Sequence, residues 1–166
     1  GTSQMCAYLT QTVLNMEILC LAADASIACS VEAIRGSHKP FDRRVHDSRP
    51  QVGQSISAAR ISAFLSQSNI EISHENCERV QDAYSFRCAP QVHGPVVDLM
   101  RETRRVLEIE INSATDNPLV FVEDNGASII SGGNFHGQNL ALASDSIAVA
   151  CHELASISER RINQIP

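Results

Sequence analysis

Three polar side chains at the spacing of a helical turn, Gln81, Tyr84 and Arg87, offer the clearest chemistry in this 166-residue chain. Residues three positions apart project from one side of a helix. Together they present an amide, a phenol and a guanidinium, and a guanidinium can hold a carboxylate through two parallel hydrogen bonds. A phenol beside that carboxylate can donate, accept or transfer a proton. The triplet predicts an amino-acid site, although the same spacing also fits an ordinary hydrogen-bonded cluster on a helix surface.

A second candidate is the glycine-rich run Ser-Gly-Gly-Asn-Phe-His-Gly at 131–137. Its glycines permit a close approach of a partner, and we expect Asn134 to cap the helix that follows. The free N–H groups of a helix start favour anions, but the run does not match the phosphate-binding glycine patterns. We therefore predict no nucleotide here, and an ordinary capped loop remains the alternative.

The cysteines and histidines do not predict a metal site. The six cysteines form no Cys-x-x-Cys pair and the six histidines no His-x-x-x-His pair, so we expect neither zinc nor a disulfide framework. This cysteine usage favours a reducing, cytoplasmic compartment. The run His74-Glu75-Asn76-Cys77 is interpreted as a chance arrangement rather than a nucleophile, and no Gly-x-Ser-x-Gly elbow is present.

The charge and hydropathy exclude other classes of partner. The net charge is −6, and no block of Lys or Arg could follow a phosphate backbone, so nucleic-acid binding is not expected. No apolar run approaches the ~20 residues of a membrane helix, and the start lacks the features of a signal peptide. The chain begins without Met, at Gly1-Thr2, and we expect it to be part of something longer.

The apolar periodicity predicts a mainly helical chain with one small β-hairpin. Asn125-Gly126 marks the turn of the hairpin, between 119–122 and 128–131. We expect 36–53 to be irregular and 68–90 to be a connection with one short helical stretch. Several expected helices are longer than a 166-residue globule requires, so they should extend through a larger bundle or pack against other subunits. The expected helices cover 3–34, 54–67, 92–113 and 137–163.

Apolar side chains at steps of three to five residues predict which face of each helix is buried. The first stripe contains Tyr8, Val13, Met16, Cys20, Ala23, Ile27 and Val31, and the second Ile56, Ile61 and Leu65. The third contains Val96, Leu99, Thr103, Val106 and Glu110, and the last Leu140, Ser144, Ile147, Cys151, Leu154 and Ile157.

Five motifs occur in a fixed order along the chain: Val-Gln-Asp-Ala-Tyr-Ser-Phe-Arg-Cys at 80–88, Pro-Gln-Val-His-Gly at 90–94, Glu-Ile-Asn-Ser-Ala-Thr-Asp-Asn-Pro-Leu at 110–119, the glycine-rich run at 131–137, and Ser-Glu-Arg-Arg-Ile at 158–162. The order of these motifs and the residues in them closely resemble those of the aromatic amino acid ammonia-lyase family, and within it those of the histidine ammonia-lyases. The resemblance covers essentially all 166 residues.

The resemblance implies a long-helix bundle of the ammonia-lyase/fumarase type, with 1–166 as a central segment of a larger enzyme. It implies non-oxidative deamination of L-histidine to urocanate in a homotetramer whose active sites draw on several subunits. The family's electrophile is a methylidene-imidazolone ring made from its own Ala-Ser-Gly. This chain contains no Ala-Ser-Gly, and the family's catalytic N-terminal Tyr loop and later Glu helix are also absent. The chain alone is therefore expected to be inactive.

The family roles transfer residue by residue. Arg87 matches the arginine that pairs with the substrate carboxylate, and Tyr84 and Gln81 match catalytic-site residues on the same segment. Phe135 matches the phenylalanine beside the methylidene-imidazolone. Asn134 and His136 flank it in positioning or capping roles, and Asn117 is interpreted as structural.

Two other functions remain open. Phenylalanine or tyrosine ammonia-lyases and related aminomutases share Arg87, Tyr84 and the Gly-Gly-Asn-Phe loop, while Ser131 and the run Pro-Gln-Val-His-Gly at 90–94 favour histidine. From a different class, the chain could be an inactive structural fragment of the tetramer.

Overall fold

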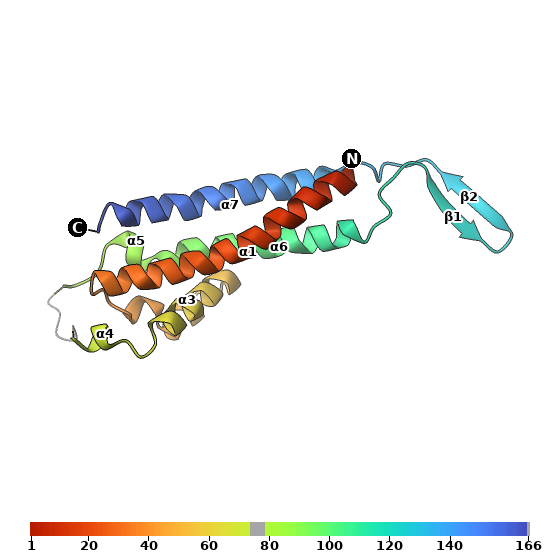
Figure 1. Cartoon of the computed structure of the whole chain (residues 1–166). Coiled ribbons are helices and arrows are strands. Elements are labelled where there is room, and N and C mark those ends of the chain that lie inside the picture. Colours follow the sequence, from red (N-terminus) through yellow and green to blue (C-terminus); the bar gives the residue numbers. More distant parts are fainter. Residues whose placement is uncertain (74–78, 166) are drawn as a thin grey trace.

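The computed structural model describes residues 1–73 and 79–165, which are mostly helical. Within this part, four long helices lie side by side in an elongated bundle (Figure 1): α1 (Thr2–Ala33), α3 (Val52–Leu65), α6 (Ala89–Ile111) and α7 (Gln138–Ile162). The shorter elements are η1 (Lys39–Phe41), α2 (Arg43–Asp47), α4 (Asn69–Ser73) and α5 (Tyr84–Arg87), with strands β1 (Leu119–Glu123) and β2 (Gly126–Ile130). The expected fold class, mainly α with one small hairpin, is confirmed.

The bundle has two distinct ends. The starts of α1 and α7 share one end, where Leu9, Leu107 and Leu140 pack in one apolar cluster. Helix α6 runs in the opposite direction, so its first residue, Ala89, packs beside Ile27 near the end of α1. Figure 1 shows α5 at this second end, and the β-hairpin projecting from the first.

The apolar stripe of α1 is correct over most of its length and wrong at its start. Five predicted members are buried and Ala23 is partly buried, but Tyr8 is 70% exposed. The buried members are Val13, Met16, Cys20, Ile27 and Val31. Leu9 and Cys6 take the place of Tyr8, because they lie four and seven residues before Val13, whereas Tyr8 lies five before it.

The stripes of α6 and α7 contain similar errors. Leu99 and Ser144 are exposed, and the core instead contains the neighbouring residues Met100 and Ala143. Each error is a shift of one residue, which rotates a helical position by about 100°. The confirmed members of these two stripes include Val96, Thr103, Leu140, Ile147, Leu154 and Ile157.

Two connecting segments are more ordered than the sequence indicated. The expectation of an irregular 36–53 was wrong, because η1 and α2 lie within it. Asp42 caps α2 by accepting a hydrogen bond from the Arg44 N–H at 2.9 Å. Hydrogen bonds from Arg44 lower the pKa of Asp42 to about 2, so the cap is ionised at neutral pH. In the described part of 68–90, two short helices, α4 and α5, replace the single expected stretch.

The hairpin is confirmed, with a small change of register. Glu123 pairs with Gly126, so Asp124 and Asn125 form the two-residue turn, one position earlier than the Asn-Gly signal indicated. Gly126 has a φ of 146°, a conformation that favours glycine.

Helices α3 and α6 approach each other closely at two glycines. A Cβ atom on Gly53 would collide with the carbonyl oxygen of Gly94, and one on Gly94 would collide with the backbone of Gln54. The Gly53 N–H also donates to Asp98 Oδ1 across this contact, at 2.9 Å. Both positions therefore require glycine for a steric reason.

Two described helices, α1 and α7, are long and apolar enough to cross a membrane by length and composition alone. The sequence had indicated no such segment, since short polar side chains interrupt their apolar runs. Core helices of large bundles meet the same criteria, and each of these helices buries a charged residue, Asp24 or Arg161, in polar contacts with another helix.

Candidate active site

The segment 79–87 combines anchored and exposed residues. Asp82 is buried, accepts the Ser37 N–H at 2.7 Å through Oδ2, and pairs with Arg79 at 3.2 Å through Oδ1. Phe86 is also buried, in the cluster at the second end of the bundle. These anchors fix the backbone on both sides of Tyr84, whose side chain is 59% exposed.

The structure places two of the three residues of the triplet on one helical turn. Tyr84 and Arg87 are the first and last residues of α5, and three-residue spacing puts them on the same side. Gln81 is exposed but precedes the helix, so helical spacing does not apply to it. The expected common face is therefore confirmed for Tyr84 and Arg87, and is wrong for Gln81.

Arg87 has unused hydrogen-bonding capacity. Its Nε is buried and has no hydrogen-bond partner among the described residues, and the same is true of Oε1 of Gln91, one turn further along the chain. Buried polar atoms of this kind are rare, because leaving one unpaired costs about 1–3 kcal/mol. Arg87 thus keeps one buried N–H donor that no described residue uses.

Phe135 lies far from this pair. It precedes the first residue of α7, whereas α5 contacts the last turn of α7 through Arg161 and Ser85. The 25 residues of α7 span roughly 37 Å at 1.5 Å per residue. Within one chain, Phe135 and Arg87 therefore lie at opposite ends of the bundle, as the positions of α5 and the start of α7 show in Figure 1.

The loop around Phe135 is held at its base and open at its tip. Asn117 Oδ1 accepts hydrogen bonds from Ser131 Oγ at 3.0 Å and from the Gly132 N–H at 2.8 Å, which agrees with a structural role. A Cβ atom on Gly132 or Gly133 would meet no atom within 4 Å, and the ring of Phe135 is 55% exposed.

The expected capping role of Asn134 is wrong. Helix α7 begins after Gly137 without a side-chain cap, and Asn134 instead donates to the carbonyl of Ala114 at 3.2 Å. Its amide therefore ties the loop to the segment that follows α6.

A buried polar network that the sequence did not reveal joins α1, α3 and α6. Asp24 Oδ1 accepts hydrogen bonds from Ser57 Oγ at 2.6 Å and from His93 Nδ1 at 2.9 Å, and Oδ2 lies 3.6 Å from Arg60 Nη1. Asp24 follows Cys20 by four residues and therefore lies in the apolar stripe of α1. A carboxylate in such a stripe was the signal in the sequence that could have indicated a buried polar network. The network connects three helices of the bundle, and both its Ser and its His contact the Asp.

Burial raises the pKa of two described thiols, Cys6 and Cys20. Five described cysteines are free, and burial raises the pKa of Cys20 to about 11, which keeps that thiol neutral. The run His74-Glu75-Asn76-Cys77 lies outside the described residues. Among 1–73 and 79–165, no three His, Cys, Asp or Glu side chains form a group that could hold a metal ion.

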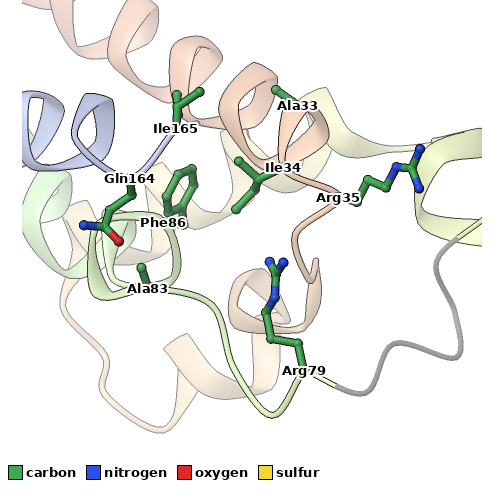
Figure 2. Close-up of a pocket in the computed structure, with 8 residues that line it drawn as sticks. All are labelled: Ala33, Ile34, Arg35, Arg79, Ala83, Phe86, Gln164 and Ile165. Atoms are coloured by element: carbon green, nitrogen blue, oxygen red, sulfur yellow. The ribbon is translucent and has the colours of Figure 1, made fainter.

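A pocket lies on another side of α5. Figure 2 shows it between Ala83 and Phe86 of this segment, Ile34 at the end of α1, and Gln164 and Ile165 after α7. None of Gln81, Tyr84, Arg87 and Phe135 lines it. The candidate site is therefore the edge of α5 that carries the exposed Tyr84 and the half-buried Arg87, and it lies apart from this pocket.

Comparisons with known proteins identify the family of the chain. The family model for aromatic amino acid lyases matches residues 1–165. The histidine ammonia-lyase of Myxococcus xanthus (strain DK1622) is 49% identical over 99% of this chain. The chain spans about a third of the length of such curated relatives, 32% in this case.

Solved structures show the same fold. A histidine ammonia-lyase from Trypanosoma cruzi superposes with a TM-score of 0.83 and 39% identity, over 96% of this chain and 28% of its own. A tyrosine aminomutase from Streptomyces globisporus superposes with a TM-score of 0.89 and 35% identity, over 99% of this chain and 34% of its own. The long helices, the hairpin and the ordered motifs therefore have one explanation: the chain belongs to the aromatic amino acid lyase family.

Proposed function

We propose that this chain is the central segment of a histidine ammonia-lyase and supplies the part that binds the substrate carboxylate. The exposed edge of α5 carries the proposal: Tyr84 projects from an anchored turn, and Arg87 on the same side has a buried Nε without a partner. In the full-length enzyme, Arg87 would bind the carboxylate of L-histidine, with Tyr84 and Gln81 beside it. The products would be urocanate and ammonia.

The proposal includes a methylidene-imidazolone formed from an Ala-Ser-Gly elsewhere in the enzyme. The open tip of the loop at 131–137 fits such a group, because the Phe135 ring is exposed and the adjacent glycines leave space for a partner. When present, the ring supplies the electrophile that makes the substrate amine a better leaving group. Phe135 would pack beside it, and Asn134 would hold the loop through Ala114.

The substrate can be tested with the full-length enzyme supplied with histidine, phenylalanine or tyrosine. We expect urocanate absorbance from histidine and none of the corresponding products from the other two. The 49% identity to the Myxococcus xanthus histidine ammonia-lyase supports the choice of histidine over phenylalanine and tyrosine. Formation of cinnamate or coumarate without urocanate would contradict the choice of histidine.

A related aminomutase is the second candidate. The tyrosine aminomutase from Streptomyces globisporus superposes with a higher TM-score, 0.89, than the Trypanosoma cruzi histidine ammonia-lyase, 0.83. An aminomutase would return a β-amino acid, so chromatography of the reaction products with all three substrates separates the two functions.

We also propose that the enzyme is a homotetramer with active sites shared between subunits. Separation of Phe135 from Arg87 by the length of α7 supports this, because one chain cannot bring both to one small substrate. Apolar side chains exposed on α1, α7 and the hairpin would be covered in such an assembly, among them Ile18, Leu142, Val149, Val122 and Ile129.

Mixed tetramers test the shared site. Arg87→Ala and Phe135→Ala enzymes should each be impaired, and co-expression should restore activity, because some sites would draw an intact Arg87 and an intact Phe135 from different subunits. Co-expression of Arg87→Ala with Tyr84→Phe is the matched control, since both changes lie on the same α5 turn and every site would keep one of them. A shared site would be contradicted if activity recovered equally in both mixtures, or if it recovered in neither of them.

The remaining proposals concern the surroundings of the enzyme. We propose a cytoplasmic location, which the free thiols of the described cysteines support. The net charge of −6 supports a small-molecule substrate rather than a nucleic acid. We propose that α1 and α7 pack in the tetramer rather than in a membrane.

A further inference from the structure

A buried arginine on α7 contacts the backbone of the candidate site. Arg161 is 3% exposed, and its Nε donates a hydrogen bond to the carbonyl oxygen of Ser85 at 3.1 Å. Burial lowers the pKa of its guanidinium to about 10, so it is charged at neutral pH. Nη2 is buried without a hydrogen-bond partner among the described residues. Burying a charge is costly, so a buried arginine with this contact calls for a specific role.

The contact falls at the centre of the substrate-binding turn. Ser85 lies between Tyr84 and Arg87 in a helix of only four residues. Such a short helix is not stable by itself and depends on tertiary contacts. Asp82 fixes the segment before α5 through Ser37, and Phe86 fixes the side of the turn that faces the core.

We propose that Arg161 is a positioning residue: by holding the Ser85 carbonyl, it sets the orientation of the α5 turn and thereby the position of the Arg87 guanidinium for the substrate carboxylate. Ser85 lies between Asp82 and Phe86 in the chain, so the bond from α7 attaches the turn at a further point, midway between Tyr84 and Phe86. The part of this proposal that concerns substrate rests on the proposed function. The part that concerns the turn does not.

Two substitutions separate the donor from the bulk of the side chain. Arg161→Gln places a neutral N–H donor at the same number of bonds from the backbone as Nε, whereas Arg161→Met places a methyl group there. We expect the Gln variant to retain the ordered turn and the Met variant to lose it. Arg160→Met is the matched control, because the Arg160 side chain is 73% exposed on the same turn of α7.

Hydrogen exchange in the full-length enzyme tests the turn without reference to activity. The amides of Phe86, Arg87 and Cys88 donate to the carbonyls of Ala83 and Tyr84 within α5. We expect their exchange to be faster in Arg161→Met and near the parent rate in Arg161→Gln and Arg160→Met, with α3 unchanged in all three. Parent-like exchange in Arg161→Met would overturn the positioning role, whatever the substrate is.

Ligand binding then tests the link to the carboxylate. For Arg161→Met we expect the KM for histidine to rise by at least about 10-fold, the effect of one charge-assisted hydrogen bond. Inhibition by histamine, which lacks the carboxylate, should change little. Equal losses for both ligands would overturn a role through Arg87, and would instead indicate general damage to the site.

The outcomes also separate this inference from the proposed function. If the parent enzyme does not act on histidine, the proposed substrate is refuted. If Arg161→Met still speeds amide exchange in α5, the positioning role is retained. Should Arg161→Met fail to fold, Arg161→Lys replaces it, since it keeps the charge but has a methylene group at the Nε position. Faster exchange in the Lys variant than in the Gln variant is then expected, and equal rates in the two would overturn the proposal.

Discussion

Replacing Arg87 with alanine in the full-length enzyme is expected to lower kcat/KM for histidine by about 10- to 150-fold, which corresponds to the ~1.5–3 kcal/mol of a charge-assisted hydrogen-bonded pair. The reason is that α5 presents the guanidinium beside Tyr84, with Nε buried and unpaired by other described residues. We expect both a higher KM and a lower turnover, because a poorly held carboxylate leaves the reacting carbon misplaced. Steady-state kinetics of urocanate formation measure both constants.

The conservative substitution at this position sharpens the test. Arg87→Lys should also be impaired, because an ammonium group cannot form the planar fork that matches a carboxylate. Arg43→Ala is a suitable control, since the Arg43 side chain is 90% exposed on α2 and pairs with Asp47 within its own helix. Near-unchanged kinetics in Arg87→Ala would remove this residue from the site.

The second large effect is expected in folding. Gly94→Ala would place a methyl group against the backbone of Gln54, where α3 and α6 are in direct contact. Backbone atoms cannot rotate away as a side chain can, so the two helices would have to separate. Overpacking of a core costs about 1–3 kcal/mol and occasionally more, and a domain has only about 5–15 kcal/mol in total. We expect a clear fall in the melting temperature, or insoluble protein.

An exposed side chain provides the comparison. Arg43→Ala should leave thermal unfolding nearly unchanged, because the Arg43 side chain is 90% exposed and pairs with Asp47 in its own helix. Circular dichroism on heating of the two full-length variants and the parent measures the difference. A melting temperature for Gly94→Ala equal to that of the parent would show that α3 and α6 can separate at little cost, against the contact described here.

The long helices and the hairpin could be predicted because their signals are local. Apolar positions three and four residues apart, a turn with Asn-Gly, and prolines near helix starts act within one or two turns of chain. Even the errors were local: Tyr8 for Leu9 in α1, and Leu99 for Met100 in α6, were shifts of one residue in a correct helix. Two short elements, η1 and α2, were missed because helices of three to five residues leave almost no periodicity.

The sequence by itself determined the helical bundle, the hairpin and the motifs that identify the family, including the segment of α5 with Tyr84 and Arg87. Only the tertiary structure decided that Phe135 lies at the other end of the bundle, and that Arg161 contacts this turn across 76 positions of sequence. The difference has a physical cause. Periodicity and capping record interactions between near neighbours in the chain, whereas a buried charge takes its partner from whichever helix the packing brings alongside it.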